Sequence, residues 1–235
     1  MNQMLEYSTD TTTWNTFDTT TNISLNNGDK VYVRGILRGN NTNVDFTQFA
    51  MTGKISISGS INAIWDYINL EVPLKEYCGY NMFLNCSSLT KAPELPATTL
   101  ANNCYYSMFN GCSLLTKAPK LPATTLADCC YYGMFANCTS LVTTPELPAT
   151  TLTAWCYQNM FVGCTSLVIA PELPATTLAD YCYCQMFYNC TSLTEAPKLP
   201  ATTMTEYCYY GMFVNCLSLT TTPELPALIL AKRCY

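Results

Sequence analysis

The chain has 235 residues, of which 49% are hydrophobic, so it can bury a core as one large domain or two small ones. Charged residues make up only 11%, and the net charge of -5 comes from 16 acidic and 11 basic side chains without a basic cluster, which excludes nucleic acid as a partner. Histidine is absent, which excludes the usual general base, most zinc sites and the Ser-His-Asp and Cys-His mechanisms.

The start of the chain carries no targeting pattern. Residues Met1 to Asp10 have neither a basic segment nor an apolar run, and no later stretch reaches the about 18 apolar residues of a membrane helix. We therefore expect no signal peptide in this chain and no membrane span.

Residues 1–69 contain neither cysteine nor proline, and this composition predicts a domain separate from the rest. The turn-forming run Asn26 to Asp29 lies between segments rich in Val, Ile, Thr, Tyr and Phe. These segments, which are typical of strands, are Met4 to Ser8, Thr13 to Phe17, Asn22 to Leu25, Lys30 to Ile36, Val44 to Phe49 and Gly53 to Ser58. We expect a small antiparallel β-sandwich or open barrel that caps or anchors the remainder, joined to it by Ile61 to Leu70.

Residues 70–235 are built from about six repeats of 26 residues. The repeat is marked by two cysteine columns: Cys78, Cys104, Cys130, Cys156, Cys182, Cys208 and Cys234, and, eight residues after the first six, Cys86, Cys112, Cys138, Cys164, Cys190 and Cys216. A Met-Phe pair, a leucine and a Leu-Pro-Ala-Thr-Thr run recur with the same period. A fixed period of this length predicts a solenoid, with shorter repeats capping its ends.

Each repeat is expected to hold one short helix and one short extended segment, which gives an α+β chain. Leu178, Cys182, Met186 and Cys190 are spaced by four, as on one buried face of a helix. A column of Asn and Gly residues follows, and both tolerate the left-handed conformation that ends a helix. Its members are Asn85, Gly111, Asn137, Gly163, Asn189 and Asn215. Two prolines per repeat limit the parallel pairing between neighbouring repeats to short ladders.

The run from Met186 to Pro200 resembles the unit of BspA-like leucine-rich repeats. The Phe, Asn/Gly, Cys, Leu and Pro columns carry the resemblance, although the unit here is longer and places Pro where a strand residue is expected. The resemblance implies a right-handed leucine-rich-repeat solenoid over residues 70–235. It also implies a role in adhesion or ligand binding at the surface of a bacterial cell, and it brings no catalytic residue.

The 15 cysteines are expected to be reduced thiols in the core. No Cys-x-x-Cys exists, so we expect no metal site. Column neighbours on packed helices would lie about 8 to 10 Å apart, farther than the Cα separation that a disulfide spans. Cys129 and Cys184 fall outside both columns and are the two thiols for which we expect exposure.

The columns that vary are the candidates for recognition. One is a ladder of charges formed by Glu94, Lys120, Glu146, Glu172, Lys198 and Glu224. Another includes the aromatic residues Trp155, Tyr181 and Tyr207. A solvated face is the alternative to a recognition surface. The invariant tyrosines Tyr105, Tyr131, Tyr157, Tyr183 and Tyr209 are expected to pack, with each hydroxyl reaching water.

These patterns favour a non-enzymatic, adhesin-like or receptor-binding module that acts outside the cell or at a cell or phage surface. Its partner would be a protein or a glycan on a host or neighbouring cell, and no catalytic residue or cofactor is expected. The alternative is a structural module that associates with itself through the solenoid ends, in a fibre or in a surface or phage-tail assembly. The apolar run Ala227 to Leu230 in the last repeat bears on that alternative.

Overall fold

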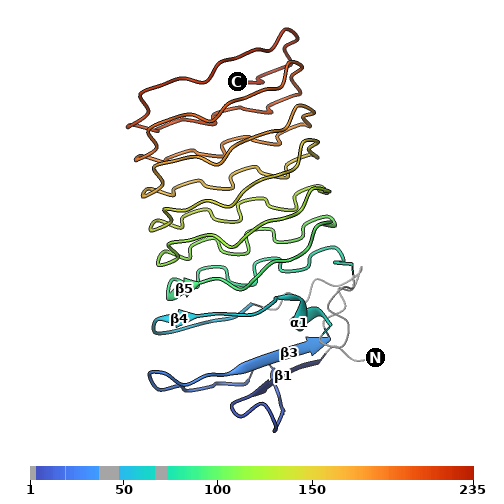
Figure 1. The fold of residues 1–235 in the computed structure, drawn as a ribbon, viewed down its shortest axis with the longest axis vertical. Coiled ribbons are helices and arrows are strands. Elements are labelled where there is room, and N and C mark those ends of the chain that lie inside the picture. The colour runs from blue at the N-terminus through green and yellow to red at the C-terminus, as the bar shows by residue number, and fades with distance from the viewer. Residues whose placement is uncertain (1–3, 19, 37–47, 67–72) are drawn as a thin grey trace.

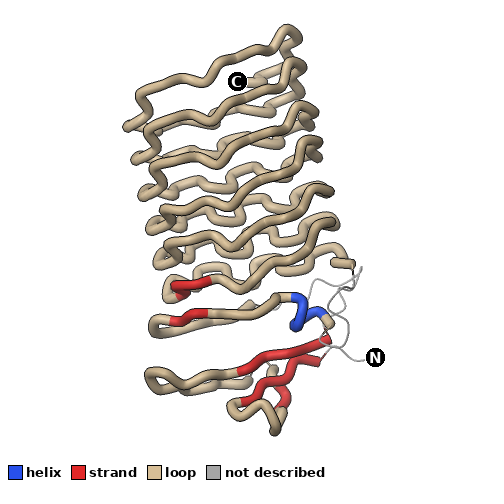
Figure 2. Tube along the Cα trace, in the orientation of Figure 1, coloured by secondary structure: helices blue, strands red, loops and turns tan. Residues whose placement is uncertain are grey.

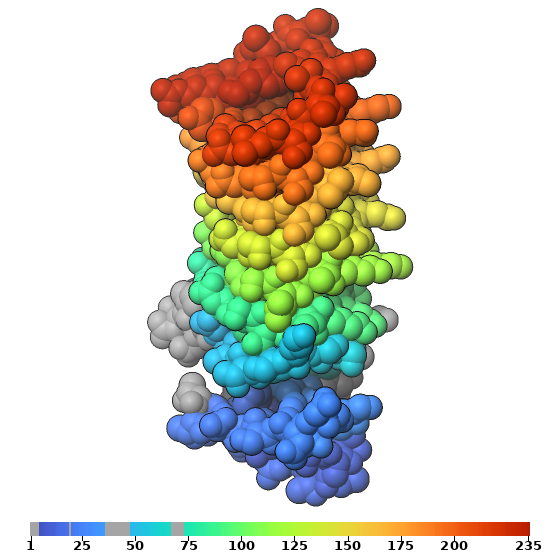
Figure 3. All heavy atoms as spheres, turned by 90° about the vertical axis from the view of Figure 1, so that its left-hand side faces the viewer, coloured from blue at the N-terminus to red at the C-terminus, as the bar shows by residue number. Residues whose placement is uncertain are grey.

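The computed structural model describes residues 4–18, 20–36, 48–66 and 73–235. The chain winds into coils that stack along one axis, with its C-terminal residues at one end of the stack (Figure 1). The coils pack as successive bands in the space-filling view (Figure 3). Regular elements are short and lie near the N-terminus (Figure 2), and they are β1 Met4–Ser8, β2 Asn15–Thr16, β3 Tyr32–Ile36, β4 Ile55–Ser56, α1 Asn62–Trp65 and β5 Leu89–Lys91.

The N-terminal region forms one antiparallel sheet of three strands in the order β2-β1-β3. β1 has the bounds expected from the sequence, and it is joined to β3 by an ion pair of Arg34 Nε and Glu6 Oε2 at 2.8 Å. Asn22 to Leu25 form no strand, and residues 44–47 of another predicted strand lie outside the described residues. The described residues do not form the expected sandwich or open barrel, because β4 pairs in parallel with β5 of the repeat region.

Residues 49–61 pack on the first repeat in the same way as one coil packs on the next. Phe49 N donates to Met82 O at 2.8 Å, Ile57 N to Lys91 O at 3.0 Å and Ile61 N to Glu94 O at 3.0 Å. The ring of Phe49 stacks on that of Phe83, with centroids 5.5 Å apart. Parallel pairing therefore begins upstream of the predicted division between residues 69 and 70.

The helix expected at 178–190 is wrong, because this segment is a run of turns. Every second N–H closes a turn three residues back, as Met186 N does on Tyr183 O at 3.1 Å. The N–H groups between them reach the next coil, as Gln185 N does on Tyr210 O at 2.8 Å. An α-helix would send each N–H four residues back within the same segment. The run is held by its neighbouring coil as much as by itself.

The turn run repeats every four residues because a left-handed residue recurs at that interval. Within one coil the backbone φ is +58° at Tyr181, +53° at Gln185 and +60° at Asn189. This interval places Cys182, Met186 and Cys190 on the same buried side, as a helix would. The predicted buried face is therefore correct, although the helix that was expected to form it is not.

The Asn/Gly column is left-handed throughout, as expected, but it ends no helix. The φ angles of its six members lie between +59° and +78°. The glycines also make room for the coil before them. A Cβ on Gly163 would lie 2.6 Å from Asn137 Oδ1, and one on Gly111 would lie 3.2 Å from Asn85 Cα. Each glycine follows a coil whose Asn amide lies against its backbone, whereas Asn215 follows Asn189 and its Nδ2 donates to Asn189 Oδ1 at 2.8 Å.

The opposite side of each coil is extended and pairs only briefly with its neighbours, as the prolines predict. The pairing is parallel and occurs as isolated bridges, such as Thr151 with Thr177 and Ile169 with Glu195. The hydrogen bonds that align the coils come mainly from the turn runs. The turn side is therefore the more regularly bonded face of the stack.

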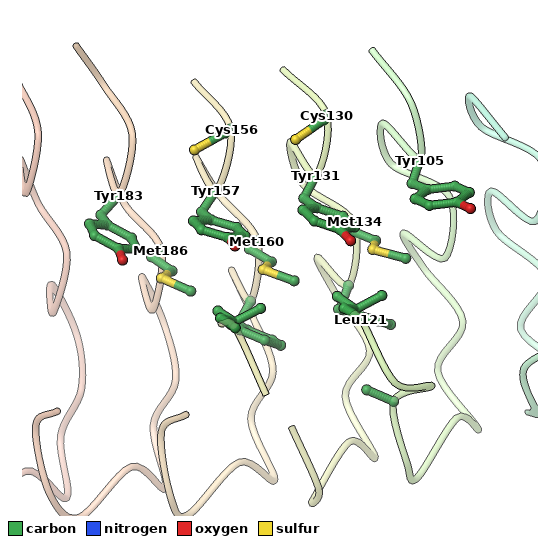
Figure 4. Packing of buried hydrophobic residues seen from close by; sticks show 14 of the residues in the cluster. Tyr105, Leu121, Cys130, Tyr131, Met134, Cys156, Tyr157, Met160, Tyr183 and Met186 are labelled. Atoms are coloured by element: carbon green, nitrogen blue, oxygen red, sulfur yellow. The ribbon is translucent and has the colours of Figure 1, made fainter. Parts of the chain in front are cut away.

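The core consists of continuous side-chain columns. Neighbouring phenylalanines from Phe83 to Phe213 stack with centroids 5.4 to 5.9 Å apart. The buried tyrosines form a parallel column at 5.6 to 6.0 Å, and their hydroxyls point the same way beside methionine side chains (Figure 4). The expectation that these hydroxyls reach water is wrong for at least four of them. The hydroxyl oxygens of Tyr105, Tyr157, Tyr183 and Tyr209 are buried without a hydrogen-bond partner.

Candidate functional site

The predicted charge ladder lies at the surface. The side chains of Glu94, Lys120, Glu146, Glu172, Lys198 and Glu224 are all exposed. Within the described part of the chain, none of them forms an ion pair, and no hydrogen bond or ring contact joins them to the predicted aromatic residues. The two predicted sets therefore do not meet in one site.

The predicted aromatic residues do come together. Trp155 and Tyr181 stack with ring centroids 6.0 Å apart, and Tyr181 and Tyr207 stack at 4.6 Å. Trp155 is 39% exposed, and the two tyrosines are half-buried. We call these three residues the C-terminal ladder. All three have a left-handed backbone, a property of their position directly before a core cysteine.

A second aromatic set was missed by the sequence analysis. Tyr80, Tyr106 and Tyr132 stack at 4.6 Å in both steps, and we call them the N-terminal ladder. They stand three positions after the column of the C-terminal ladder, and the two columns touch where Tyr207 meets Tyr210, with centroids 5.4 Å apart. The sequence did contain a signal for this set, because its column holds Tyr in three successive coils and Gln158 and Cys184 in the next two. A column that varies in this way is a candidate for recognition, like the columns singled out above.

The hydroxyls of Tyr106 and Tyr181 are neutral at ordinary pH. Burial, followed by the neighbouring rings of Tyr132 and Tyr80, raises the pKa of Tyr106 to about 12. Burial, followed by Tyr207, also raises the pKa of Tyr181. At these two positions the ladders therefore offer uncharged hydroxyls, which can both donate and accept hydrogen bonds.

Acidic side chains stand directly before Tyr181 and Tyr207 of the C-terminal ladder, and Asp128 stands before Cys129 in the same column. Asp128 Oδ1 accepts a hydrogen bond from Ala154 N at 3.1 Å, and Asp180 Oδ1 accepts one from Glu206 N at 3.0 Å. These bonds fix each carboxylate against the following coil. Asp128, Asp180 and Glu206 are exposed, and none pairs with a lysine or arginine among the described residues.

The last coil places a cation at the end of the C-terminal ladder. Arg233 occupies the ladder column one coil beyond Tyr207, with Cζ 5.7 Å from the ring centroid. Its Nη1 donates to the Tyr207 hydroxyl at 3.1 Å. The chain thus shows one way in which a guanidinium group fits this surface.

The cysteines lie mostly in the core. Thirteen of the fifteen are buried, and thiols of the second column donate to the Phe carbonyl of the preceding coil, as Cys138 Sγ does to Phe109 O at 3.1 Å. Cys129 is half-buried, in line with the sequence, but Cys184 is only 4% exposed, so its predicted exposure is wrong. Cys216 is half-buried instead, because its coil lies near the end of the stack. Among the described residues, no group of three His, Cys, Asp or Glu side chains could hold a metal ion.

Within the described ranges, none of the helices has the length and apolar character that crossing a membrane requires. No family profile matches the chain, and no curated protein or solved structure is significantly similar to it.

Proposed function

We propose that this chain is a non-enzymatic binding module that presents the turn side of its coil stack to a protein or glycan partner on another cell. The observation that carries the proposal is the C-terminal ladder, in which Trp155, Tyr181 and Tyr207 stand in register on three successive coils and remain partly open to solvent. Trp and Tyr are the residues most enriched among those that dominate interface energies.

Rigidity favours the same surface. Each ladder residue is held by its neighbour's ring and by backbone hydrogen bonds to the next coil, such as Trp155 N to Asp180 O at 3.1 Å and Tyr181 N to Glu206 O at 3.0 Å. A side chain that is already ordered loses little conformational entropy when it binds. The ladder can therefore contribute affinity without first being organised.

We also propose that the stack is a right-handed solenoid related to BspA-like leucine-rich repeats, and that it acts outside the cell or at a cell surface. The columns that carry the resemblance each have one physical role. The Phe column stacks, the Asn/Gly column is left-handed, and the second Cys column donates to carbonyls. The helix of the expected unit is replaced here by the turn run.

The test is a binding screen with a ladder variant. The immobilised chain is screened on arrays of glycans and extracellular proteins, beside a variant with Trp155→Ser, Tyr181→Ser and Tyr207→Ser. Because residues of this kind each contribute about 2 kcal/mol or more, we expect affinity for a true partner to fall at least 100-fold.

The matched control carries Val142→Ser, Val168→Ser and Ile169→Ser, three exposed residues on the extended side of the stack. It should bind as the unchanged chain does. A partner that binds both variants equally well would contradict the assignment of the ladder as the binding site.

One observation favours the alternative structural role. The last coil exposes Leu225, Leu228 and Leu230 to 54%, 88% and 65%, whereas Leu173 and Leu178, which match Leu225 and Leu230 two coils earlier, are 3% and 8% exposed. An apolar face of this kind favours association with a second copy. If that is the function, the mass measured by light scattering should grow with concentration, and Leu228→Asp should prevent the growth. A constant monomer mass over the series would exclude it.

A further inference from the structure

The column of the C-terminal ladder has a gap in its aromatic rings at Cys129, the position that precedes Trp155. The ladder column reads Asn103, Cys129, Trp155, Tyr181 and Tyr207 in successive coils. Tyr181 stacks on the Trp155 indole, and the same column position in the preceding coil holds the short side chain of Cys129 in place of a ring. Cys129 N donates to Ala154 O at 3.0 Å, which fixes the two coils side by side at this point. Among the described residues no second ring lies against Trp155.

The gap is acidic. Asp128 precedes Cys129, and its Oδ1 is bound to the backbone N–H of Ala154, the residue before Trp155. The carboxylate is therefore held at the backbone of the residue next to Trp155. Its charge also acts on Cys129, because burial and then Asp128 raise the pKa of that thiol, which stays neutral. No lysine or arginine of the described chain neutralises Asp128.

The other end of the ladder shows what such a site accepts. There Arg233 lies over the outer face of Tyr207 and donates to its hydroxyl at 3.1 Å. Trp binds cations on its face more strongly than Tyr does, and a planar guanidinium both stacks on a ring and binds a carboxylate. The end at Trp155 has the better ring and an added carboxylate, but no cation from the described chain.

We propose that the gap formed by Asp128, Cys129 and Trp155, here called the junction, binds an arginine side chain of a partner polypeptide. The guanidinium lies over the open face of Trp155, and the Asp128 carboxylate is its counter-ion. The inference rests on the proposed binding function and names the chemistry of the partner. A neutral sugar would leave the Asp128 carboxylate without a counter-ion, because no lysine or arginine of the described chain pairs with it, and this favours a cationic protein over a neutral glycan.

The test uses the full chain with an oligoarginine peptide, and an oligocitrulline peptide as its uncharged match. Cation–π pairs contribute about 0.5 to 2 kcal/mol, so Trp155→Ala should weaken oligoarginine binding roughly tenfold. Asp128→Asn keeps the bond to Ala154 but removes the charge, and it should weaken binding to a similar extent. Asp180→Asn is the matched control, because it makes the same kind of backbone bond beside Tyr181, whose two faces are covered by rings.

Alkylation of Cys129 locates the peptide. Oligoarginine should slow the reaction of Cys129 with N-ethylmaleimide and leave Cys216, the other half-buried thiol, unchanged. Equal binding of the two peptides, or equal effects of Asp128→Asn and Asp180→Asn, would overturn the inference. If Trp155→Ala removes a partner found by the screen while Asp128→Asn does not, the cationic assignment fails and the proposed binding function stands. If neither variant affects any partner, both fail.

Discussion

Raising the pH above about 9 is expected to unfold the chain in one steep transition with a midpoint near pH 10. The cause is the set of buried thiols. Burial raises the pKa of Cys130, Cys138 and Cys190 to about 12, and it raises the pKa of Cys164 and Cys182 well above the ordinary value of 9.0. An ionised thiol would also lose the hydrogen bond that the Sγ of a second-column cysteine donates to a Phe carbonyl.

The sign follows from where the protons are lost. Between about pH 9 and pH 12 the unfolded chain releases thiol protons that the folded chain retains, so the free energy of unfolding falls as pH rises. Each such thiol lowers it by about 1.4 kcal/mol per pH unit. Because an unfolded thiol is only half ionised at pH 9, about ten of them acting together would remove about 10 kcal/mol between pH 9 and pH 10, which is as much as a typical domain has. Below about pH 9 this contribution is fully present.

Circular dichroism along a pH series, with a reductant present, measures the transition. Cys164→Ala removes one titrating group. The free energy of unfolding should then fall less steeply with pH, by the contribution of one proton. Chemical denaturation at several pH values gives that slope directly. A spectrum that stays native at pH 11 would mean that the thiols are not buried as protonated groups.

The period of 26 residues and the buried columns could be predicted because identical residues recur at the same positions in every coil. The local conformation could not. Leu178, Cys182 and Met186 share a side at a spacing of four, and both a helix and a run of turns meet that condition. What separates the two is the positive φ at residues such as Trp155 and Tyr181, and no ordinary propensity assigns that conformation to an aromatic residue.

The candidate site was predictable only in part. Trp155, Tyr181 and Tyr207 stand in one variable column, so a coil stack must bring them together. The N-terminal ladder was hidden because Tyr106 and Tyr132 lie beside the invariant Tyr105 and Tyr131 in the chain. Only the turn run shows which of each pair faces outward, since Tyr105 and Tyr131 are buried and Tyr106 and Tyr132 are not. The gap at Cys129 likewise becomes visible only when neighbouring coils are in register.

Replacing Phe135 by alanine is expected to lower the free energy of unfolding by about 3 to 5 kcal/mol. Phe135 is fully buried between Phe109 and Phe161, with ring centroids 5.7 and 5.8 Å away. The substitution removes both stacking contacts and leaves a cavity in the middle of the stack. Urea denaturation followed by circular dichroism measures the loss.

The position in the stack should matter as much as the ring itself. In a chain of repeats each unit is stabilised by its neighbours alone, so a cavity at Phe135 weakens the coupling between the coils on either side and should broaden or split the transition. Phe213→Ala removes a half-buried ring that stacks on Phe187 at 5.9 Å near the end, and it should cost less and leave one transition. Tyr157→Phe keeps a buried ring and removes a hydroxyl without a partner, so it should be neutral or stabilising. Equal losses for Phe135→Ala and Phe213→Ala would mean that the coils do not unfold as a column of coupled neighbours.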